Sequence, residues 1–468
     1  MKKLLIIALI LGIALPIFAQ WKEFYYISVL LASALVFFSL KKWEVSLIDL
    51  LVLFLITIPL HTLRFGTQEH FIRLSEIAFI PLFLWWLAQL FLKEPGKPLT
   101  IRKEFIFLFF YLLINIVSTR NSIYPYISIK RIAILAYLFL FTYMVTNILN
   151  NKDKIAVIVK ATILISGLSA IIAAFQCVFP KLIIFTAVPI GTLFGITFYR
   201  AGVGWHDPNY YALYLGMNAG LTLTFILSPG IGLIKKHLLK ICFLLQIIGI
   251  LSTFSRTVFL SLIFVILYLL YYFGRKKLAF GLFSITLATL IMLSVSSLTI
   301  YRRNPFFASV FYRVADKERL KEQPTLIMGH RYAAFKANTA MFLDHPLLGV
   351  GPFMAMYNFD KYSPLGYKYP MHWLASHNQY LQLLAEKGIF GFLIFLGFIL
   401  AILTNMYRFI RKTNDPLGKT CLIGLKSSVF VYLIASLALE SSYELQFWLT
   451  MGLSMAIFNL LNKKEIDA

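Results

Sequence analysis

The sequence predicts an all-α membrane protein that crosses the bilayer many times. Of its 468 residues, 60% are hydrophobic and only 14% are charged, and the mean hydropathy is +0.79. A soluble protein has about half apolar and about a quarter charged residues. The apolar residues form blocks of bilayer-spanning length along almost the whole chain. These observations exclude a soluble globular enzyme, a disordered chain and a coiled coil.

Fourteen apolar runs are candidate membrane spans. The first follows Lys2 and Lys3 as a secretory signal would, but Ile17 stands where a cleavage site has a small residue, and a second apolar run comes at once. We therefore expect a retained span. The runs cover about residues 4–19, 24–40, 45–62, 75–92, 104–118, 131–149, 155–179, 209–228, 238–254, 256–273, 278–299, 389–406, 420–439 and 447–462.

The three cysteines, Cys177, Cys242 and Cys421, each lie inside an apolar run. Their odd number and their place in apolar runs favour neither a disulfide framework nor a thiolate metal site. We expect them to be small core residues.

The basic residues predict the orientation of the chain. With a cytoplasmic N-terminus, 22 of the 44 Lys and Arg residues fall in cytoplasmic loops, eleven in residues 300–388, and two, Lys160 and Lys426, inside spans near their cytoplasmic ends. The excess of basic residues in the cytoplasmic loops over the short external loops follows the positive-inside rule, so both termini are predicted to be cytoplasmic. The net charge of +24 therefore requires no nucleic-acid partner. The short external loops hold the other nine: Lys22, Arg64, Arg73, Arg120, Lys130, Arg131, Lys181, Arg200 and Arg256.

The expected organisation is a membrane bundle of about eleven spans over 1–299, a periplasmic helical segment over 300–388 and about three further spans over 389–468. Within the middle segment, the run DHPLLGVGPF (344–353) separates two helix-like pieces. The second begins near His377 and is expected to end at Gly388, with Tyr380, Leu381 and Leu384 on the face of His377. The first carries an apolar stripe that is expected to lie on the membrane domain, formed by Met328, Tyr332, Phe335, Thr339 and Phe342.

Energy-coupled transport finds little support. The cytoplasmic loops are short, and the sequence contains neither GxxxxGK[ST] nor a dinucleotide-binding fingerprint. Asp49 and Glu76 lie near span ends rather than deep in the membrane, which gives an ion-driven transporter weak support.

Three arginines on the external side are candidate anion-binding residues. Arg200 lies in FYRAGVGWHDPNYYA (198–212), where glycines permit close backbone approach and Asp207, Pro208 and Asn209 can form a turn that caps a helix. Arg256, in STFSRTVF, has no acidic residue within twenty positions, and a guanidinium suits a bidentate phosphate. Arg331 lies in MGHRYAAFKANTAMFLDHPLLGVG. The alternatives are a lid loop with an Arg200–Asp207 pair, a lipid-headgroup anchor at Arg256 and an ordinary surface residue at Arg331.

A candidate general base is His377, at the start of an amphipathic helix in SHNQYLQLLAEKGIFG. A neutral imidazole is the usual base for a hydroxyl nucleophile, and the alternative is a histidine that only caps the helix. We expect no metal. The nearest approach to an acidic metal-binding pair, Asp316 and Glu318, alternates with basic residues like a solvated helix face, and His372 and His377 lack the i, i+4 spacing of a helical zinc pair.

The motifs together resemble the O-antigen ligase and polymerase superfamily, whose members take glycan from an undecaprenyl-diphosphate carrier. The similar segments are RAGVGWHDPNYYA (200–212), FSRTVFLSL (254–262), GHRYAAFKANTAMFLDHPLLGVG (329–351) and HNQYLQLLAEKGIFG (377–391), in the family's order. The last fits the family pattern H-[NSQ]-x-x-L-x(6)-G through His377, Asn378, Leu381 and Gly388. The resemblance covers the middle and late chain, and the first six spans match only in hydropathy.

The resemblance implies a metal-independent membrane glycosyltransferase of the GT-C kind with no cofactor and about twelve spans, so that two of the fourteen, 4–19 and 104–118 being the doubtful ones, would be interfacial. It implies that Arg200, Arg256 and Arg331 bind the carrier diphosphate and that His377 activates the acceptor hydroxyl. We assign supporting roles to His206, Asn209, Asn378 and Tyr380.

The leading expectation is an O-antigen ligase of the cell inner membrane, with its active site facing the periplasm. Its partners would be an undecaprenyl-diphosphate-linked glycan, a lipid A-core acceptor and membrane lipids, with no nucleic acid. An O-antigen polymerase or protein O-oligosaccharyltransferase keeps the donor and changes the acceptor. A lipid-linked-sugar flippase is the rival from another class, and it would need no base at His377.

Overall fold

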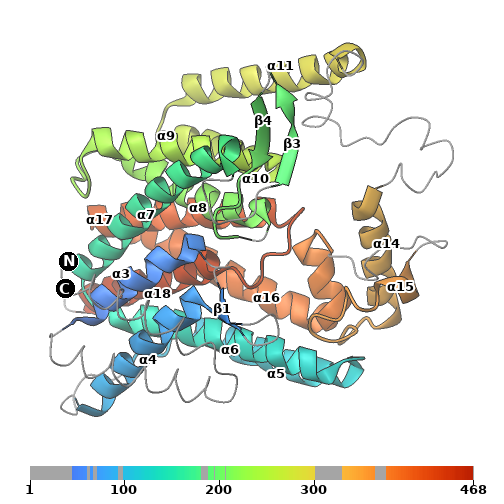
Figure 1. Ribbon diagram of the computed structural model, residues 1–468. Coiled ribbons are helices and arrows are strands. Elements are labelled where there is room, and N and C mark those ends of the chain that lie inside the picture. Colours follow the sequence, from blue (N-terminus) through green and yellow to red (C-terminus); the bar gives the residue numbers. More distant parts are fainter. Residues whose placement is uncertain are drawn as a thin grey trace.

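The structure is a bundle of long helices, as the sequence predicts (Figure 1). This computed structural model describes residues 45–60, 64–66, 71–92, 99–180, 188–193, 196–205, 207–300, 329–363 and 376–466. The predicted spans 4–19 and 24–40, His206, His372 and the Asp316–Glu318 pair lie outside these residues.

The described elements are almost all helical. Two short antiparallel hairpins, β1–β2 and β3–β4, supply the strands. In chain order the elements are α3 (Leu47–Thr57), η2 (Ile58–Leu60), β1 (Arg64–Gly66), β2 (Phe71–Arg73), α4 (Leu74–Leu92), α5 (Glu104–Ser118), η3 (Thr119–Asn121), α6 (Pro125–Ile148), α7 (Lys152–Val178), β3 (Val188–Leu193), β4 (Ile196–Arg200), α8 (Pro208–Leu227), α9 (Lys236–Thr253), α10 (Arg256–Tyr272), α11 (Lys276–Ile300), α14 (Gly329–Asp344), α15 (Phe359–Tyr362), α16 (Gln379–Lys412), α17 (Pro416–Ala435) and α18 (Leu445–Ile466).

Eight helices in the described part of the chain are long and apolar enough to cross a membrane, and the polytopic helical fold is therefore confirmed. They cover Leu74–Phe91, Glu104–Asn121, Pro125–Ile148, Lys152–Val178, Pro208–Leu227, Lys236–Thr253, Gln379–Lys412 and Pro416–Ala435, and two shorter apolar helices cover Leu47–Leu60 and Arg256–Tyr272. The predicted span 389–406 is the later part of α16, which continues to Lys412.

Helix α8 is the centre of the bundle, and small residues let its neighbours approach it. A Cβ added to Gly216 would come within 2.8 Å of Val258 on α10, and one added to Gly424 on α17 would come within 2.5 Å of Leu221 on α8. Small residues at such crossings allow the close helix packing that membrane proteins rely on. The three cysteines are free and buried, as expected.

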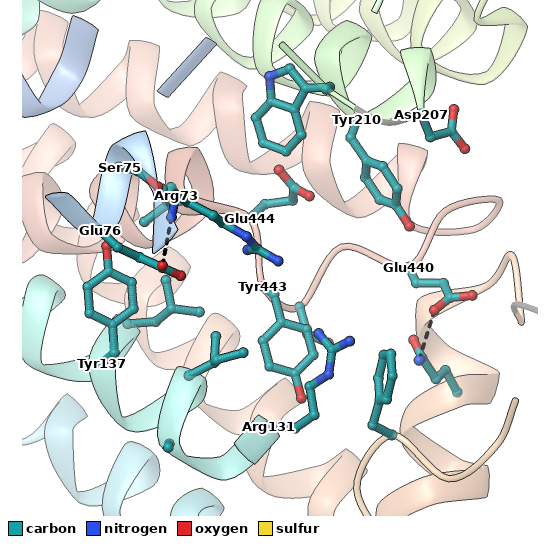
Figure 2. Close-up of a pocket in the computed structure, with 18 of the residues that line it drawn as sticks. Arg73, Ser75, Glu76, Arg131, Tyr137, Asp207, Tyr210, Glu440, Tyr443 and Glu444 are labelled. Carbon is teal, nitrogen blue, oxygen red and sulfur yellow. Dashed lines mark hydrogen bonds between the residues drawn. The ribbon is translucent and has the colours of Figure 1, made fainter. Parts of the chain in front are cut away.

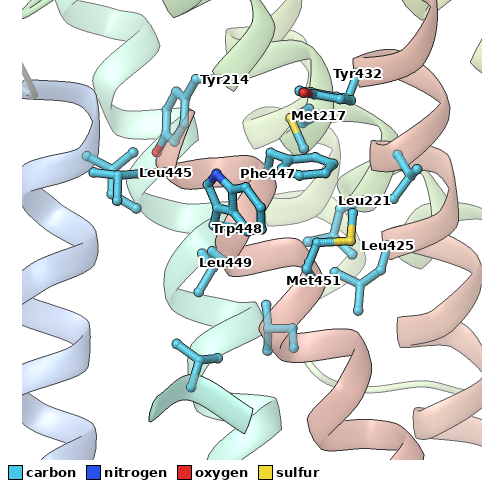
Figure 3. Close-up of a cluster of buried hydrophobic side chains, with 14 of the residues drawn as sticks. Tyr214, Met217, Leu221, Leu425, Tyr432, Leu445, Phe447, Trp448, Leu449 and Met451 are labelled. Carbon is cyan, nitrogen blue, oxygen red and sulfur yellow. The ribbon is translucent and has the colours of Figure 1, made fainter. Parts of the chain in front are cut away.

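Aromatic and thioether side chains fill the space between α8, α17 and α18 (Figure 3). The rings of Tyr432 and Phe447 stack with their centroids 4.1 Å apart, and Trp448 is fully buried beside them. The Trp448 indole N–H donates to the Ser442 carbonyl at 2.9 Å, so its one polar atom is satisfied. This cluster anchors the loop between α17 and α18, which forms one wall of a cavity.

Helix α16 breaks at Gly388, the position where the sequence predicts the amphipathic piece to end. Gly388 has φ 62° and ψ −168°, a conformation essentially restricted to glycine, and the helix resumes after it. A Cβ at Gly388 would collide with the Leu347 carbonyl, because the 344–353 segment passes directly against the break. The Val350 and Gly351 amides donate to the Ala385 and Glu386 carbonyls at 2.8 and 3.0 Å.

The prediction of which residues form the buried face of α14 is wrong. Its buried side is formed by Ala333, Ala334, Ala337 and Met341, whereas Tyr332 and Phe335 are 38% and 48% exposed, Thr339 and Phe342 are half-buried, and Met328 lies outside the described residues. The physical reason is the size of the side chains. Alanines let α14 pack closely on α15 and α16, where Ala385 joins the same cluster, and this leaves the larger rings outside.

The orientation can be tested with an engineered thiol at Asp360, which is exposed on α15. A membrane-impermeant maleimide should label the Asp360→Cys thiol in cells whose outer barrier has been opened but whose inner membrane is still sealed. The reason is that residues 300–388 are predicted to be external. Lys276→Cys, exposed at the predicted cytoplasmic end of α11, is the matched control and should react only after permeabilisation. The buried native cysteines give little background. Labelling of the Asp360→Cys variant only after permeabilisation would contradict the orientation.

Candidate functional site

A cavity of about 630 Å³ lies where several helix ends meet, on the side predicted to be external (Figure 2). Its walls come from the starts of α4, α6, α8 and α16, the 344–358 segment and the loop between α17 and α18. The volume is that of a small-molecule site. The charged and phenolic side chains that line it are Arg73, Glu76, Arg131, Tyr137, Asp207, Tyr210, Glu440, Tyr443 and Glu444.

The cavity has two distinguishable sides. Asp207 and Glu440 lie together on one side, and Arg73 and Glu76 lie on the other (Figure 2). The Arg73 backbone amide donates to Glu76 Oε2 at 3.0 Å, which joins the start of α4 to the preceding strand. Arg131 contributes a second guanidinium from α6.

Glu440 is the acidic residue of the cavity wall that is best suited to accept a proton. Its Oε2 accepts a hydrogen bond from Gln382 Nε2 at 2.9 Å, and its Oε1 accepts one from the His377 backbone amide at 3.3 Å. Burial, together with the like charge of Glu386, raises the pKa of Glu440 to about 7. A carboxyl group with a pKa near neutrality can take or give a proton during turnover.

The loop that carries Glu440 is held against α16 by a buried glutamine. Gln379 Oε1 accepts from the Ser441 and Ser442 backbone amides at 2.6 and 2.9 Å. The Gln379 backbone amide donates to the Ser436 carbonyl at 2.9 Å. The Gln379 side-chain amide also donates to the Ser442 hydroxyl. These bonds fix the α17–α18 loop relative to the first turn of α16.

His377 immediately precedes this helix but does not cap it. The cap is Asn378, whose Oδ1 accepts from the Leu381 amide at 3.0 Å and whose Nδ2 donates to the Leu437 carbonyl at 3.0 Å. His377 has φ 50°, in the left-handed region that is uncommon for residues other than glycine. The alternative of a capping histidine is therefore wrong. His377 is half-buried and is linked to the cavity wall by the hydrogen bond that its backbone amide donates to Glu440.

Tyr380, a predicted supporting residue, faces α17. Its hydroxyl donates to the Leu433 carbonyl at 2.7 Å. This contact gives Tyr380 a role in holding α16 against α17.

Arg200 is connected to the cavity through Asn209. Arg200 Nε donates to the Thr253 carbonyl and Nη2 donates to Asn209 Oδ1, both at 3.0 Å. Asn209 Nδ2 in turn donates to Asp207 Oδ1 at 2.8 Å, and the same carboxylate oxygen accepts from the Asn209 amide and caps α8. The expected turn and cap are thus present, with Asn209 placed between Arg200 and Asp207.

Arg256 starts α10 close to the segment that ends in Arg200. The Ala201 amide donates to the Ser252 carbonyl at 3.0 Å, and Phe254 turns the chain in a left-handed conformation between α9 and α10. Arg256 is exposed at the first position of α10, where the helix dipole also favours an anion. The structure therefore brings the segments of Arg200 and Arg256 together.

Arg331 lies on the first turn of α14, where it is exposed. Among the described residues that line the cavity, none is Arg200, Arg256, Arg331 or His377. Two motif segments nevertheless form part of the wall, through Trp205, Asp207 and Tyr210 of 200–212 and through Gln382 of 377–391.

The sequence reasoning missed five charged wall residues: Arg73, Glu76, Arg131, Glu440 and Glu444. Both arginines were among the nine basic residues of the short external loops, where the positive-inside rule disfavours them, and that bias could have selected them. In the described ranges, no group of three or more His, Cys, Asp and Glu side chains is placed to hold a metal ion.

Comparison with known proteins identifies one region of the chain. No curated protein matches the sequence. Residues 241–396, about a third of the chain, match the family model described as O-antigen ligase. The matched region runs from α9 into α16 and contains Arg256, Arg331 and His377, while Arg200 precedes it. Residues 241–396 are therefore an O-antigen ligase family domain, consistent with the O-antigen ligase and polymerase superfamily.

Proposed function

We propose that this protein is an O-antigen ligase that transfers glycan from undecaprenyl diphosphate to a lipid A-core sugar hydroxyl at the periplasmic face of the inner membrane. The family domain supports a function of the O-antigen ligase or polymerase type in a multi-pass membrane protein. The observation that carries the finer assignment is the cavity lined by charged and phenolic side chains, because both motifs reach its wall. Asn209 of the Arg200 motif donates to Asp207, and the His377 backbone amide donates to Glu440.

The arginines supply the charge stabilisation that the leaving group needs. Departure of a diphosphate develops negative charge, which fixed guanidiniums stabilise without a metal. Arg200 is held by two hydrogen bonds, and Arg256 adds its charge at the start of α10. Arg331 would contribute from α14 when donor is bound.

The acceptor hydroxyl needs only the removal of a proton. His377 is the proposed base, and Glu440, tied to its backbone amide, is the second group able to take that proton. Attack on the sugar carbon from the side opposite the diphosphate inverts the anomeric configuration and breaks the bond to the phosphate oxygen, which leaves with the diphosphate.

The acceptor is tested directly with purified protein and synthetic undecaprenyl-diphosphate glycan, offered lipid A-core, free glycan or a pilin peptide in parallel. Mass spectrometry of the products should show glycan joined to lipid A-core. Glycan joined to glycan would instead indicate a polymerase, and glycan on peptide a protein O-oligosaccharyltransferase. Donor that crosses the bilayer with no transfer to any acceptor would indicate a flippase.

The first prediction concerns the guanidinium forks. Arg256→Lys keeps the charge but loses the planar fork, so turnover should fall by roughly 10² to 10³-fold, the loss associated with one preorganised charge-stabilising donor. Arg331→Lys should also reduce turnover. Arg275→Lys, exposed beyond the far end of α10, is the matched control and should retain it. Wild-type rates in both Arg256→Lys and Arg331→Lys would reduce these residues to membrane anchors.

The second prediction identifies the base. His377→Asn is the sharpest variant, because asparagine tolerates the left-handed backbone at this position and keeps the backbone hydrogen bond to Glu440. Turnover should fall by roughly 10² to 10⁴-fold with donor binding retained. Asn151→Ala, which removes the side-chain cap of α7, is the structural control and should lower stability by about 1 kcal/mol while it leaves transfer largely intact.

Glu440→Gln separates the two proton acceptors. Because the pKa of Glu440 is raised to about 7, its carboxyl is protonated below that pH and ionised above it. If Glu440 is the base, the wild-type rate should rise with pH through about 7, and Glu440→Gln should lose turnover as severely as the histidine variant. Full transfer in His377→Asn together with none in Glu440→Gln would move the role from His377 to Glu440.

The third prediction is that transfer needs no divalent metal, since guanidiniums are proposed to carry the leaving-group charge. Turnover measured in excess EDTA should equal the untreated rate. Loss of turnover in EDTA that magnesium or manganese restores would contradict the mechanism and would direct attention to Asp316 and Glu318.

A further inference from the structure

Arg131 is a cation inside the cavity that the proposed mechanism leaves without a role. It lies in the second turn of α6 and is partly buried, and its guanidinium points into the cavity beside Tyr443 (Figure 2). Its contacts are aromatic: the guanidinium carbon is 3.4 Å from the Phe353 ring centroid and 5.8 Å from that of Tyr443. In the part of the chain that the structure describes, Arg131 forms no ion pair with an acidic side chain.

The carboxylates of the cavity wall interact with other groups. Glu440 accepts from Gln382 and from the His377 amide, and Asp207 accepts from Asn209. On the other side, Glu76 accepts from the Arg73 amide and Glu444 interacts with the Arg73 charge. Glu386, close enough to influence Arg131, is ion-paired with Lys387 at 2.8 Å. A charge that is withdrawn from water without a counter-charge is unfavourable, and such groups in membrane proteins commonly mark ligand sites.

Phe353 is held against Arg131 at a conformational cost. It has φ 63°, a left-handed backbone that a phenylalanine rarely adopts. Two hydrogen bonds fix the surrounding turn: the Ser128 hydroxyl donates to the Pro352 carbonyl at 2.8 Å, and the Met354 amide donates to the Gly351 carbonyl at 3.1 Å. The ring covers one face of the guanidinium and leaves its N–H edge to the cavity, the arrangement that a bidentate oxyanion requires.

The size and lining of the cavity point to a saccharide rather than a lone ion. Its volume of about 630 Å³ far exceeds that of a phosphate, and phenolic and carboxylate side chains are suitable partners for sugar hydroxyls. We infer that Arg131 binds an oxyanion carried by the saccharide substrate, either a phosphate linked to the sugar or a sugar carboxylate. The inference rests on the proposed function for the identity of the substrate as a saccharide.

Binding to the purified full-length protein tests this site without any transfer assay. The probes are inorganic pyrophosphate for the phosphate source and glucuronic acid for the carboxylate source, with glucose as the neutral control, and binding is followed by ligand-observed NMR. Arg131→Gln should weaken binding of at least one anion by about tenfold or more, as expected for loss of a charge-assisted contact. Lys130→Gln removes the neighbouring exposed charge outside the cavity and should leave binding unchanged.

Two further variants guard against misfolding. Arg131→Lys retains the charge without the fork and should bind between wild type and Arg131→Gln. Phe353→Leu keeps the arginine but removes the ring that holds it, and it should weaken anion binding less than Arg131→Gln does.

The outcomes distinguish a phosphate ligand from a carboxylate ligand, and they distinguish failure of the Arg131 site from failure of the proposed function. Dependence on Arg131 for pyrophosphate alone assigns the site to a diphosphate, and dependence for glucuronic acid alone assigns it to an acidic sugar. Equal anion binding by wild type and Arg131→Gln, or no anion binding by wild type, would overturn the inference. Anion binding that depends on Arg131 in a protein that transfers no glycan would instead reject the proposed function and leave the site standing.

Discussion

The close contact between the break in α16 and the 344–353 segment is the constraint on which the site depends. Two glycines make it possible: a Cβ at Gly388 would collide with the Leu347 carbonyl, and a Cβ at Gly349 would collide with the Glu386 carbonyl. Because the helix is interrupted there, the Ala385 and Glu386 carbonyls are free to accept amides from the passing segment. The break therefore satisfies its own backbone groups, as burial at a helix end requires.

The same contact determines where the charges of the cavity lie. It leads the chain from Gly351 into the turn that places Phe353 on Arg131, and it fixes the first turns of α16, from which Gln382 reaches Glu440. It also buries the Glu386–Lys387 ion pair, whose side chains are each 2% exposed. A buried pair adds little net stability compared with apolar residues, but breaking it by removing one partner is costly, so it is better suited to fixing one arrangement of the break than to strengthening the fold.

The spans could be predicted because their length and apolarity are properties of contiguous sequence. The buried face of α14 could not be predicted in this way. The apolarity of Tyr332 and Phe335 indicated a buried face, but the side that packs is the one with alanines, which permit close approach. The motif segments were found, and two of them supply part of the cavity wall, but most of its charged residues were not identified. Arg73, Arg131 and Glu440 come from three distant parts of the chain, and no local pattern records that their helix ends converge. The cap at Asn378 was similarly hidden, because a left-handed residue before it is a matter of tertiary context.

The separation of charges within the cavity suits a transfer between two saccharides. Asp207 and Glu440 lie on the side to which the Arg200 and His377 motifs attach, so the proposed leaving group and proton acceptor meet there (Figure 2). Arg73 lies on the other side, which leaves the space between for sugar rings rather than for the reacting bond. If the reaction were placed instead beside Arg73, the diphosphate would lie away from the hydrogen-bonded Arg200 and the acceptor oxygen away from both proton acceptors. Orientation of both reactants accounts for much of the rate of such transfers, and the first placement supplies it with Arg200 and Glu440, which are both held by hydrogen bonds.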